Sequence, residues 1–298
     1  MDTVFKRLGA FGLAAAICTC IVLWGQGLWQ PLVVANLKFH PEIPWSPMVM
    51  AVLLAGLLLY LSGRGWPHST SETRRRLLRW NPMPLSTFTL AVLAGGLAVG
   101  AFSGVWIAVS DLVHIPAGVQ PDVAGAPAPT LTAILIMSAM AAPLSEEAAF
   151  RGYAQGILER AWGSPMAAIL GSTALFAAVH ILQGPDPVKL SLYFGAGLIF
   201  AAIAYLTNSL YPVMVVHAVG DILGFTVFWP HDQRPHAMGF ADPSLAPALA
   251  AIAIFTPLAF LAFVRLGLAA RPLRDSRLLR ASADKAEAQN GDPCRLVL

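Results

Sequence analysis

The chain has 298 residues, of which 57% are hydrophobic and only 12% are charged, and its formal net charge is +3. A soluble domain carries about 25% charged residues, so this composition excludes a water-soluble globular protein and predicts that most of the chain lies in lipid. The three cysteines exclude a framework of several disulfides.

Apolar stretches recur along the whole chain. A helix needs about 20 apolar residues to cross the hydrocarbon core of a bilayer. We therefore predict an all-α, polytopic membrane protein with about eight transmembrane helices around an intramembrane polar cavity. The expected spans are 8–24, 46–62, 85–110, 131–158, 164–183, 188–207, 210–229 and 245–268.

Positive charges predict the orientation, because Lys and Arg favour the cytoplasmic side of a membrane. They precede the first span, fill the second connection and follow the last span, whereas 111–130 contains none. With eight spans, both termini and the arginine-rich connection face the cytoplasm, and we expect a plasma (inner) membrane. The arginines indicate topology rather than nucleic-acid binding. The residues are Lys6, Arg7, Arg64, Arg74, Arg75, Arg76, Arg79, Arg265, Arg271, Arg274, Arg277 and Arg280.

The segment SEEAAFRG places charge inside the fourth predicted span. Glu147 and Arg151 are four residues apart, so on a helix they share a face and can pair. Glu146 is rotated away from them and has no local partner. Pro143 leaves the carbonyl of Ala139 without its helical donor and predicts a kink. Freed backbone persists in a membrane only where protein or water satisfies it, so we expect a hydrated cavity beside the glutamates.

Two further motifs place polar groups on neighbouring spans. FAAVH ends at His180, four residues after Phe176, and HAVGD carries His217 and Asp221 at the same spacing. A charged group at mid-bilayer costs ~3 kcal/mol by insertion scales unless it is paired or hydrated. A lone histidine in a membrane helix is usually a hydrogen-bond partner of another helix, but three such features in neighbouring spans indicate one shared site.

Straight helices do not place these groups at one depth. If 131–160 and 164–183 form a hairpin that turns near Gly163, Glu146 and His180 are similarly far from the turn. His217 lies only a few residues into its own span, nearer the cytoplasmic side. A kinked or tilted helix, or a shifted boundary, is needed to bring it level with the other two.

A carboxylate and an imidazole in a low-dielectric pocket form an acid/base pair. Arg151 can hold Glu147 ionised, which leaves Glu146 as a general base for a water molecule, with His180 as its proton-sharing partner. Hydrolysis of a carbonyl also needs a donor for the developing negative charge, which His217 can supply. The HExxH motif of zinc proteases does not occur in the sequence.

The three segments EEAAFR, FAAVH and HAVGD resemble the EExxxR, FxxxH and HxxxN/D motifs of the CPBP family, the CAAX-protease and bacteriocin-processing (Abi) membrane proteins. The eukaryotic Ras-converting CAAX endopeptidase belongs to this group. The resemblance covers about 125–230 and matches in order, spacing and membrane setting. It divides the chain into N-terminal helices with the arginine-rich loop (1–124), a CPBP-type catalytic core (125–230), and a last helix with a polar tail (231–298).

The resemblance implies an eight-helix intramembrane endopeptidase of the glutamate type that needs no cofactor. Its partners would be the lipid bilayer and a protein or peptide substrate, lipidated or membrane-anchored, and no nucleic acid. Glu146 corresponds to the family's catalytic glutamate and His180 to its partner in activating water. Glu147 and Arg151 would support Glu146.

His217 and Asp221 match the family pair assigned to oxyanion stabilisation. Asp221 is a departure, since the best-studied members have Asn there, and an ionised aspartate has no hydrogen to donate to an oxyanion. Asp221 can orient His217 instead, or act when protonated. Because the family was long regarded as metal-dependent, His180, His217 and Asp221 as zinc ligands form an alternative.

Two functions from other classes stay open beside peptide hydrolysis. Intramembrane Glu and His chains also serve as proton relays, so the chain can be a proton-coupled transporter. It can also be a non-catalytic membrane scaffold that has kept the fold. No internal repeat of the kind common in transporters is found in the sequence.

Overall fold

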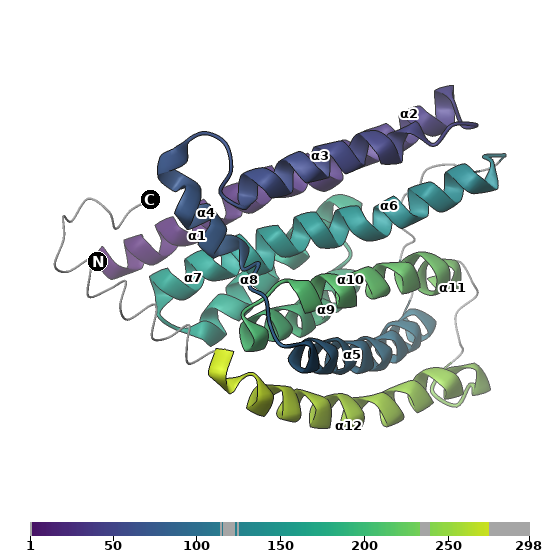
Figure 1. The fold of residues 1–298 in the computed structure, drawn as a ribbon. Coiled ribbons are helices and arrows are strands. Elements are labelled where there is room, and N and C mark those ends of the chain that lie inside the picture. Colours follow the sequence, from purple (N-terminus) through teal and green to yellow (C-terminus); the bar gives the residue numbers. More distant parts are fainter. Residues whose placement is uncertain (1, 114, 116–122, 124, 233–238, 274–298) are drawn as a thin grey trace.

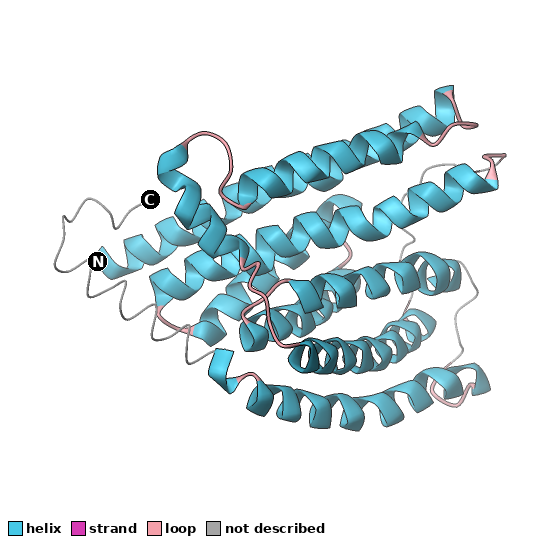
Figure 2. Ribbon diagram, viewed as in Figure 1, coloured by secondary structure: helices cyan, strands magenta, loops and turns pink. Residues whose placement is uncertain are grey.

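The computed structural model describes residues 2–113, 115, 123, 125–232 and 239–273. Nearly all of these residues are helical, and no strand occurs among them (Figures 1 and 2). The tail from residue 274 onward, with Arg274, Arg277 and Arg280, lies outside the described residues.

The described helices follow one another with short connections, as expected for a polytopic membrane protein. The α-helices are α1 (Asp2–Val22), α2 (Leu28–Phe39), α3 (Trp45–Leu61), α4 (Ser71–Leu78), α5 (Leu85–Leu112), α6 (Ala128–Glu146), α7 (Gln155–Trp162), α8 (Pro165–Val179), α9 (Pro187–Thr207), α10 (Tyr211–Leu223), α11 (Trp229–Asp232) and α12 (Ala246–Ala269). Shorter 3-10 or π-helical segments join them: η1 (Leu23–Gly27), η2 (His68–Thr70), η3 (Glu147–Ala154), η4 (His180–Gln183), η5 (Gly224–Phe228) and η6 (Pro243–Leu245).

Among the described residues, seven helical stretches are long and apolar enough to cross a membrane, and the shorter α3 is a further apolar helix. This agrees with the prediction of about eight spans in an all-α, multi-pass membrane protein. The first stretch differs from its prediction, because it continues from Val4 to Phe39 instead of ending near residue 24. Pro31 does not stop it: the π-helical turn η1 precedes the proline and absorbs the disturbance.

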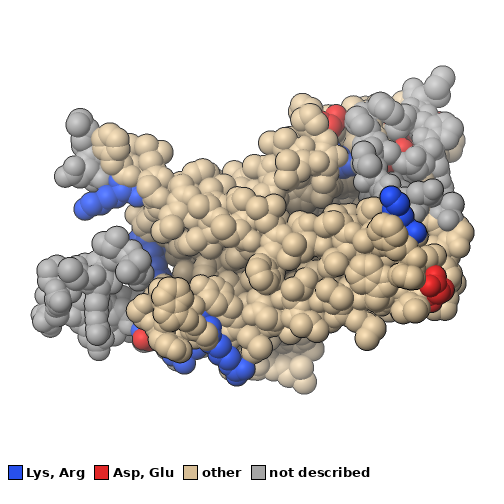
Figure 3. Space-filling model, turned by 90° about the horizontal axis from the view of Figure 1, so that it is seen from above, with Lys and Arg blue, Asp and Glu red and all other residues tan. Residues whose placement is uncertain are grey.

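The helices lie roughly side by side, with α5 between α12 and the helices α9 and α10 (Figure 1). Charged side chains on the face seen in Figure 3 lie mainly toward its two ends, and a broad uncharged surface separates them. This distribution suits a molecule whose middle faces hydrocarbon. At one end, Nε2 of His231 lies 2.8 Å from Oδ1 of Asp111 and joins α11 to α5.

Close packing of α5 against α12 depends on Gly104. A Cβ atom there would lie 2.5 Å from the backbone oxygen of Ala248 and 2.9 Å from Ile252 Cγ1. The backbone oxygen of Ala248 cannot move aside, whereas the end of a flexible side chain could. Small residues of this kind let transmembrane helices approach closely.

We expect Gly104→Ala to destabilise the protein by about 1–3 kcal/mol, because overpacking forces the two helices apart. Gly96, on the same helix, has nothing within 4 Å of an added Cβ. Gly96→Ala is the matched control, and it should leave stability unchanged or slightly raised, since alanine favours helix over glycine. Unfolding temperature in detergent measures both, and equal effects of the two variants would contradict the packing argument.

Two arginines of the second connection are buried structural residues. Arg74 is 5% exposed and donates hydrogen bonds to the backbone oxygens of Tyr60 and Arg64. Arg79 is 4% exposed, its Nη2 lies 2.6 Å from Oε2 of Glu159 on α7, and burial lowers its pKa to about 10. The hydrogen bonds of these two side chains therefore hold the second connection against the bundle. This structural role comes in addition to the effect of their charge on membrane orientation.

Candidate active site

The helix that carries both glutamates changes its winding at the site. α6 contains Pro143 in its interior and passes at Glu147 into the π-helical segment η3, which ends at Ala154. π-helical turns are rare and often occur at functional sites. Every residue of η3 is buried. α6 continues through Pro143 as part of one helical stretch from 128 to 162, and the kink expected at the proline stays a prediction.

The depth of His217 follows from where α10 begins. A Cβ atom at Gly152 would lie 3.5 Å from Cδ1 of Leu210, so the start of α10 packs beside the middle of η3. From that contact, α10 runs antiparallel to η3 and α6 (Figure 1). Glu146 is six residues from Gly152, and His217 is six residues from Tyr211. The side chains of Glu146 and His217 therefore lie at a similar position along the length of the bundle.

The α9–α10 turn is held inside the bundle by the end of the arginine-rich connection. The backbone N–H of Leu210 donates to the oxygen of Arg79 at 3.2 Å, and Nδ2 of Asn81 donates to the oxygen of Asn208 at 2.7 Å. The predicted boundary near residue 210 agrees with the helix start at Tyr211. His217 reaches the glutamates because the whole α9–α10 turn lies inside the bundle. The start of α10 is where the sequence predicts it.

His217 lies among three carboxylates. Its Nδ1 is 2.6 Å from Oε1 of Glu147, and its Nε2 is 3.5 Å from Oδ1 of Asp221 and 3.9 Å from Oε2 of Glu146. An ionised carboxylate only accepts, so Nδ1 donates in the short bond to Glu147. Phe200 stacks on the imidazole with ring centroids 4.5 Å apart. Glu147 and Phe200 thus orient the ring so that Nε2 faces Glu146 and Asp221.

Arg151 is fully buried next to Glu147, one of the three carboxylates around His217. Its Nη1 lies 3.1 Å from Oε1 of Glu147, and both side chains are 0% exposed, so the predicted ion pair is present. Nη2 donates to the backbone oxygen of Gly197 at 3.2 Å. The guanidinium lies 4.2 Å from the ring centroid of Phe176 and 5.3 Å from that of Phe200. The carboxylate and the aromatic faces together compensate the buried charge.

His180 begins the 3-10 turn η4 directly after α8. Its Nδ1 is 2.8 Å from the backbone oxygen of Phe176. A carbonyl oxygen only accepts, so Nδ1 donates and a neutral ring presents the lone pair of Nε2. The ring of Tyr193 stacks on that of His180 with centroids 3.8 Å apart. The tautomer and the orientation of His180 are both set by its surroundings.

The six predicted side chains meet in one region, although not through the contacts expected from sequence. Glu146 is nearest to His217, and no hydrogen bond or ion pair joins it to His180 in the part of the chain that the structure describes. The ring of Phe176 lies near both histidines, at centroid distances of 4.8 Å from His180 and 6.1 Å from His217. The pairing of Glu146 with His180 through a water molecule stays a prediction.

Sequence reasoning missed the contribution of α9. Tyr193, Gly197 and Phe200 lie on one face of this helix at spacings of four and three residues. Tyr193 contacts His180, Gly197 accepts from Arg151, and Phe200 covers His217. All three are ordinary residues of an apolar span, so only their neighbours in space identify them.

With His180 as the proton-sharing partner that the sequence predicts, we expect Tyr193→Leu to lower kcat about tenfold, because the His180 ring loses the stacked face that orients it. Tyr193→Phe keeps the stacked ring and loses only the hydroxyl contact with Gln183 at 3.0 Å. It is the matched control and should retain nearly full kcat. Cleavage rates of purified protein measure both, and equal loss in the two variants would assign the effect to the hydroxyl instead.

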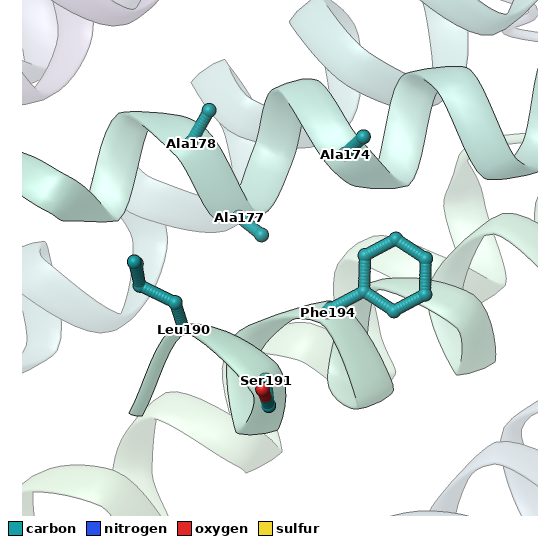
Figure 4. Close-up of a pocket in the computed structure, with 6 residues that line it drawn as sticks. All are labelled: Ala174, Ala177, Ala178, Leu190, Ser191 and Phe194. Atoms are coloured by element: carbon teal, nitrogen blue, oxygen red, sulfur yellow. The ribbon is translucent and has the colours of Figure 1, made fainter. Parts of the chain in front are cut away.

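The site itself is closely packed. Glu146, His180 and His217 are 6%, 7% and 5% exposed, while the side chain of Asp221 is 21% exposed. A separate apolar groove lies between α8 and α9, lined by Ala174, Ala177, Ala178, Leu190, Ser191 and Phe194 (Figure 4). It contains no titratable side chain. The hydrated cavity expected beside the glutamates stays a prediction.

The proposed zinc ligands do not form a matching set. Among the described residues, no group of three or more His, Cys, Asp or Glu side chains has the arrangement to hold a metal ion. Nδ1 of His180 and Nδ1 of His217 are engaged by Phe176 and Glu147.

The segment that holds the candidate site matches a known protein-family model. Residues 128–223 match a family model described as type II CAAX prenyl endopeptidase Rce1-like. This segment runs from the first residue of α6 to the last residue of α10 and holds all three polar motifs. Neither a comparison with curated proteins nor one with solved structures gives a match. The resemblance noted in the sequence is confirmed: the segment that builds the site is similar to the Rce1-like endopeptidases of the CAAX-protease family, whose members are peptide hydrolases.

Proposed function

We propose that the chain is an intramembrane endopeptidase that hydrolyses a peptide bond of a membrane-associated or processed protein with a water molecule activated by Glu146 and His180. One observation carries the proposal: His217 joins Glu146, Glu147 and Asp221 in a single network, and Phe176 lies between this network and His180, within the segment that matches the peptidase family. Such a concentration of ionisable groups inside a bilayer is a functional feature by default.

Glu146 is proposed as the general base. Its carboxylate lies beside His217 and has no bond to Arg151, whereas Glu147 is engaged by both Arg151 and His217. Glu147 is therefore proposed to hold Arg151 and His217 in place, whereas Glu146 is proposed to accept and release the proton. His180, with Nδ1 bound to the oxygen of Phe176, presents Nε2 to the same water.

The reaction then needs one water and no covalent enzyme intermediate. As the water oxygen attacks the carbonyl carbon, its proton passes to Glu146 and the carbonyl oxygen becomes negatively charged. When the C–N bond breaks, Glu146 returns the proton to the leaving amine. Glu146 holds the proton of the water molecule between the two steps, so the reaction as a whole neither gains nor loses a proton.

His217 is proposed to stabilise the oxyanion. Its Nδ1–H is held by Glu147, so that Nε2, when protonated, donates toward the reacting oxygen. Asp221, 3.5 Å from Nε2, is proposed to orient this ring. This gives the aspartate a role that does not require it to donate to the oxyanion itself.

We further propose that the reaction needs no metal and that the end of the bundle formed by the start of α1, α4 and the end of α12 faces the cytoplasm of a plasma (inner) membrane. These segments lie at one end of the molecule, which supports the orientation (Figure 1). The arginines of the second connection belong to the same end.

Comparison of membrane proteomes tests the proposal. Cells with the wild-type chain should contain new protein termini that are absent from cells with Glu146→Gln, and the purified protein should cleave the corresponding peptide with or without a zinc chelator. Identical termini in both strains would overturn the endopeptidase proposal. Loss of cleavage on chelation, restored by zinc, would replace the glutamate mechanism with a metal-bound water. Proton-dependent uptake into vesicles without cleavage would favour the transporter.

A further inference from the structure

The α3–α4 loop, residues 62–70, is closed around the buried guanidinium of Arg74. Gly63 has φ +93°, and an added Cβ there would overlap the backbone oxygen of Ser71, so the chain turns tightly where the loop begins. The guanidinium donates to four backbone oxygens at 2.6–3.2 Å, those of Tyr60, Arg64, Gly65 and Pro67. The conformation of the loop is therefore fixed before anything binds to it, which lowers the entropic cost of binding.

The same loop is attached to the helix that carries the candidate site. The hydroxyl of Tyr153, in η3, lies 3.1 Å from the backbone oxygen of Leu61 and 3.3 Å from that of Arg74. These two oxygens belong to the helices on either side of the loop, α3 and α4. A partner bound to the loop is thus held at a fixed position relative to η3.

The loop presents an aromatic ring and positive charge on its outer side. Trp66 is 82% exposed, and Arg64 and Arg75 are exposed as well. An added Cβ at Gly63 would lie 3.5 Å from Cβ of Arg75, which places this arginine against the start of the loop. The acidic residue of α4, Glu72, is engaged by Arg76. The surface of the loop therefore combines an exposed indole with a net positive charge.

The length of α3 places the loop at the depth of the lipid headgroups. α3 has 17 residues, so it is about 26 Å long at 1.5 Å per residue, close to the ~30 Å thickness of a hydrocarbon core. The loop at its end arches outward from the side of the bundle, and α1 extends further toward the same end (Figure 1). Trp66 and its arginines are therefore on the flank of the molecule, where lipid headgroups surround it.

We propose that the α3–α4 loop binds an anionic phospholipid: Trp66 lies among the headgroups, and Arg64 and Arg75 pair with the lipid phosphate. Tryptophan suits this depth because its ring is apolar and carries one N–H donor. Arginines next to a membrane span attract anionic lipids, and a guanidinium group can bind a phosphate through two parallel hydrogen bonds. This site is independent of the proposed endopeptidase function.

Tryptophan fluorescence of the full chain in phosphatidylcholine vesicles tests the proposal. The difference between the wild-type chain and Trp66→Phe isolates the signal of Trp66. Bromine near the top of an acyl chain quenches an indole at the headgroup boundary, whereas iodide quenches an indole in water. Equal fractions of brominated phosphatidylglycerol or brominated phosphatidylcholine then measure the relative affinity of the anionic and the zwitterionic lipid beside Trp66.

We expect bromine and not iodide to quench Trp66, with phosphatidylglycerol preferred about 5- to 25-fold, because each arginine near the surface contributes roughly fivefold. The double variant Arg64→Gln/Arg75→Gln should reduce this preference to near equality, and both side chains are exposed, so the variant should fold. Arg64→Lys/Arg75→Lys keeps the charge and should retain most of the preference. Lys38→Gln is the control, because Lys38 is in the last turn of α2, at the opposite end of the bundle (Figure 1).

Three results would overturn the lipid site. Quenching of Trp66 by iodide and not by bromine would place the loop in water. Equal quenching by the two brominated lipids, or a preference that persists in Arg64→Gln/Arg75→Gln, would exclude pairing with the phosphate. Protection of Trp66 from iodide only after an acidic peptide is added would assign the loop to a protein partner instead.

Discussion

Replacing Glu146 by Gln is expected to lower kcat for the natural substrate about 10²- to 10⁴-fold, the usual contribution of a general base. The amide keeps the shape of the side chain and cannot take a proton from water. Because Glu146 makes neither the ion pair with Arg151 nor the short bond to His217, the variant should fold normally. Steady-state cleavage by purified protein and its unfolding temperature in detergent are the measurements.

His180→Ala should abolish cleavage as well, and the double variant distinguishes a shared role from two separate ones. If both residues act on one water, the double variant loses little more than the more impaired single variant. Glu42→Gln is the control, since the side chain of Glu42 is 60% exposed and lies in the α2–α3 connection. Unchanged cleavage in both Glu146→Gln and His180→Ala would end the proposed mechanism.

Arg151→Met is expected to destabilise the protein by about 3–5 kcal/mol, because it leaves the carboxylate of Glu147 buried without its arginine partner. Both side chains of the pair are 0% exposed, and the guanidinium also donates to Gly197. The change in unfolding temperature, together with the yield of folded protein from membranes, measures the effect. Activity should fall with it, because Glu147 orients His217.

The chain contains a matched control for this variant. Arg76 and Glu72 form an ion pair at the same spacing of four residues, but their side chains are 44% and 61% exposed. Exposed pairs contribute about 0–1 kcal/mol, so Arg76→Met should leave stability nearly unchanged. If the two methionine variants have equal effects, burial is not what makes the Glu147–Arg151 pair important.

The double variant Glu147→Gln/Arg151→Met tests where the instability arises. Removing both charges should recover much of the stability lost in Arg151→Met, because no buried charge then lacks its partner. Catalysis should stay low, since the amide that replaces the Glu147 carboxylate accepts only a weaker, uncharged hydrogen bond from His217. Recovery of activity together with stability would contradict the role assigned to Glu147.

Local features of this protein could be predicted from the order of residues. Hydrophobic runs predict spans because each helix satisfies its own backbone hydrogen bonds, whatever surrounds it. Pairs four residues apart, such as Glu147 with Arg151 and His217 with Asp221, lie on one face of any helix, and both are within 3.5 Å in the structure. The turn near Gly163 was also predictable, and this glycine has φ +65°.

Relations between helices were not predictable in the same way. The level of His217 depends on a turn recessed beside Gly152 and held by Arg79, which are far from it in sequence. The contact of Tyr193 with His180 depends on how α9 is rotated against α8. Helical periodicity specifies which residues share a face, but the depth and rotation of each helix arise from side-chain packing between segments, and a single hydrophobic pattern is compatible with many such arrangements.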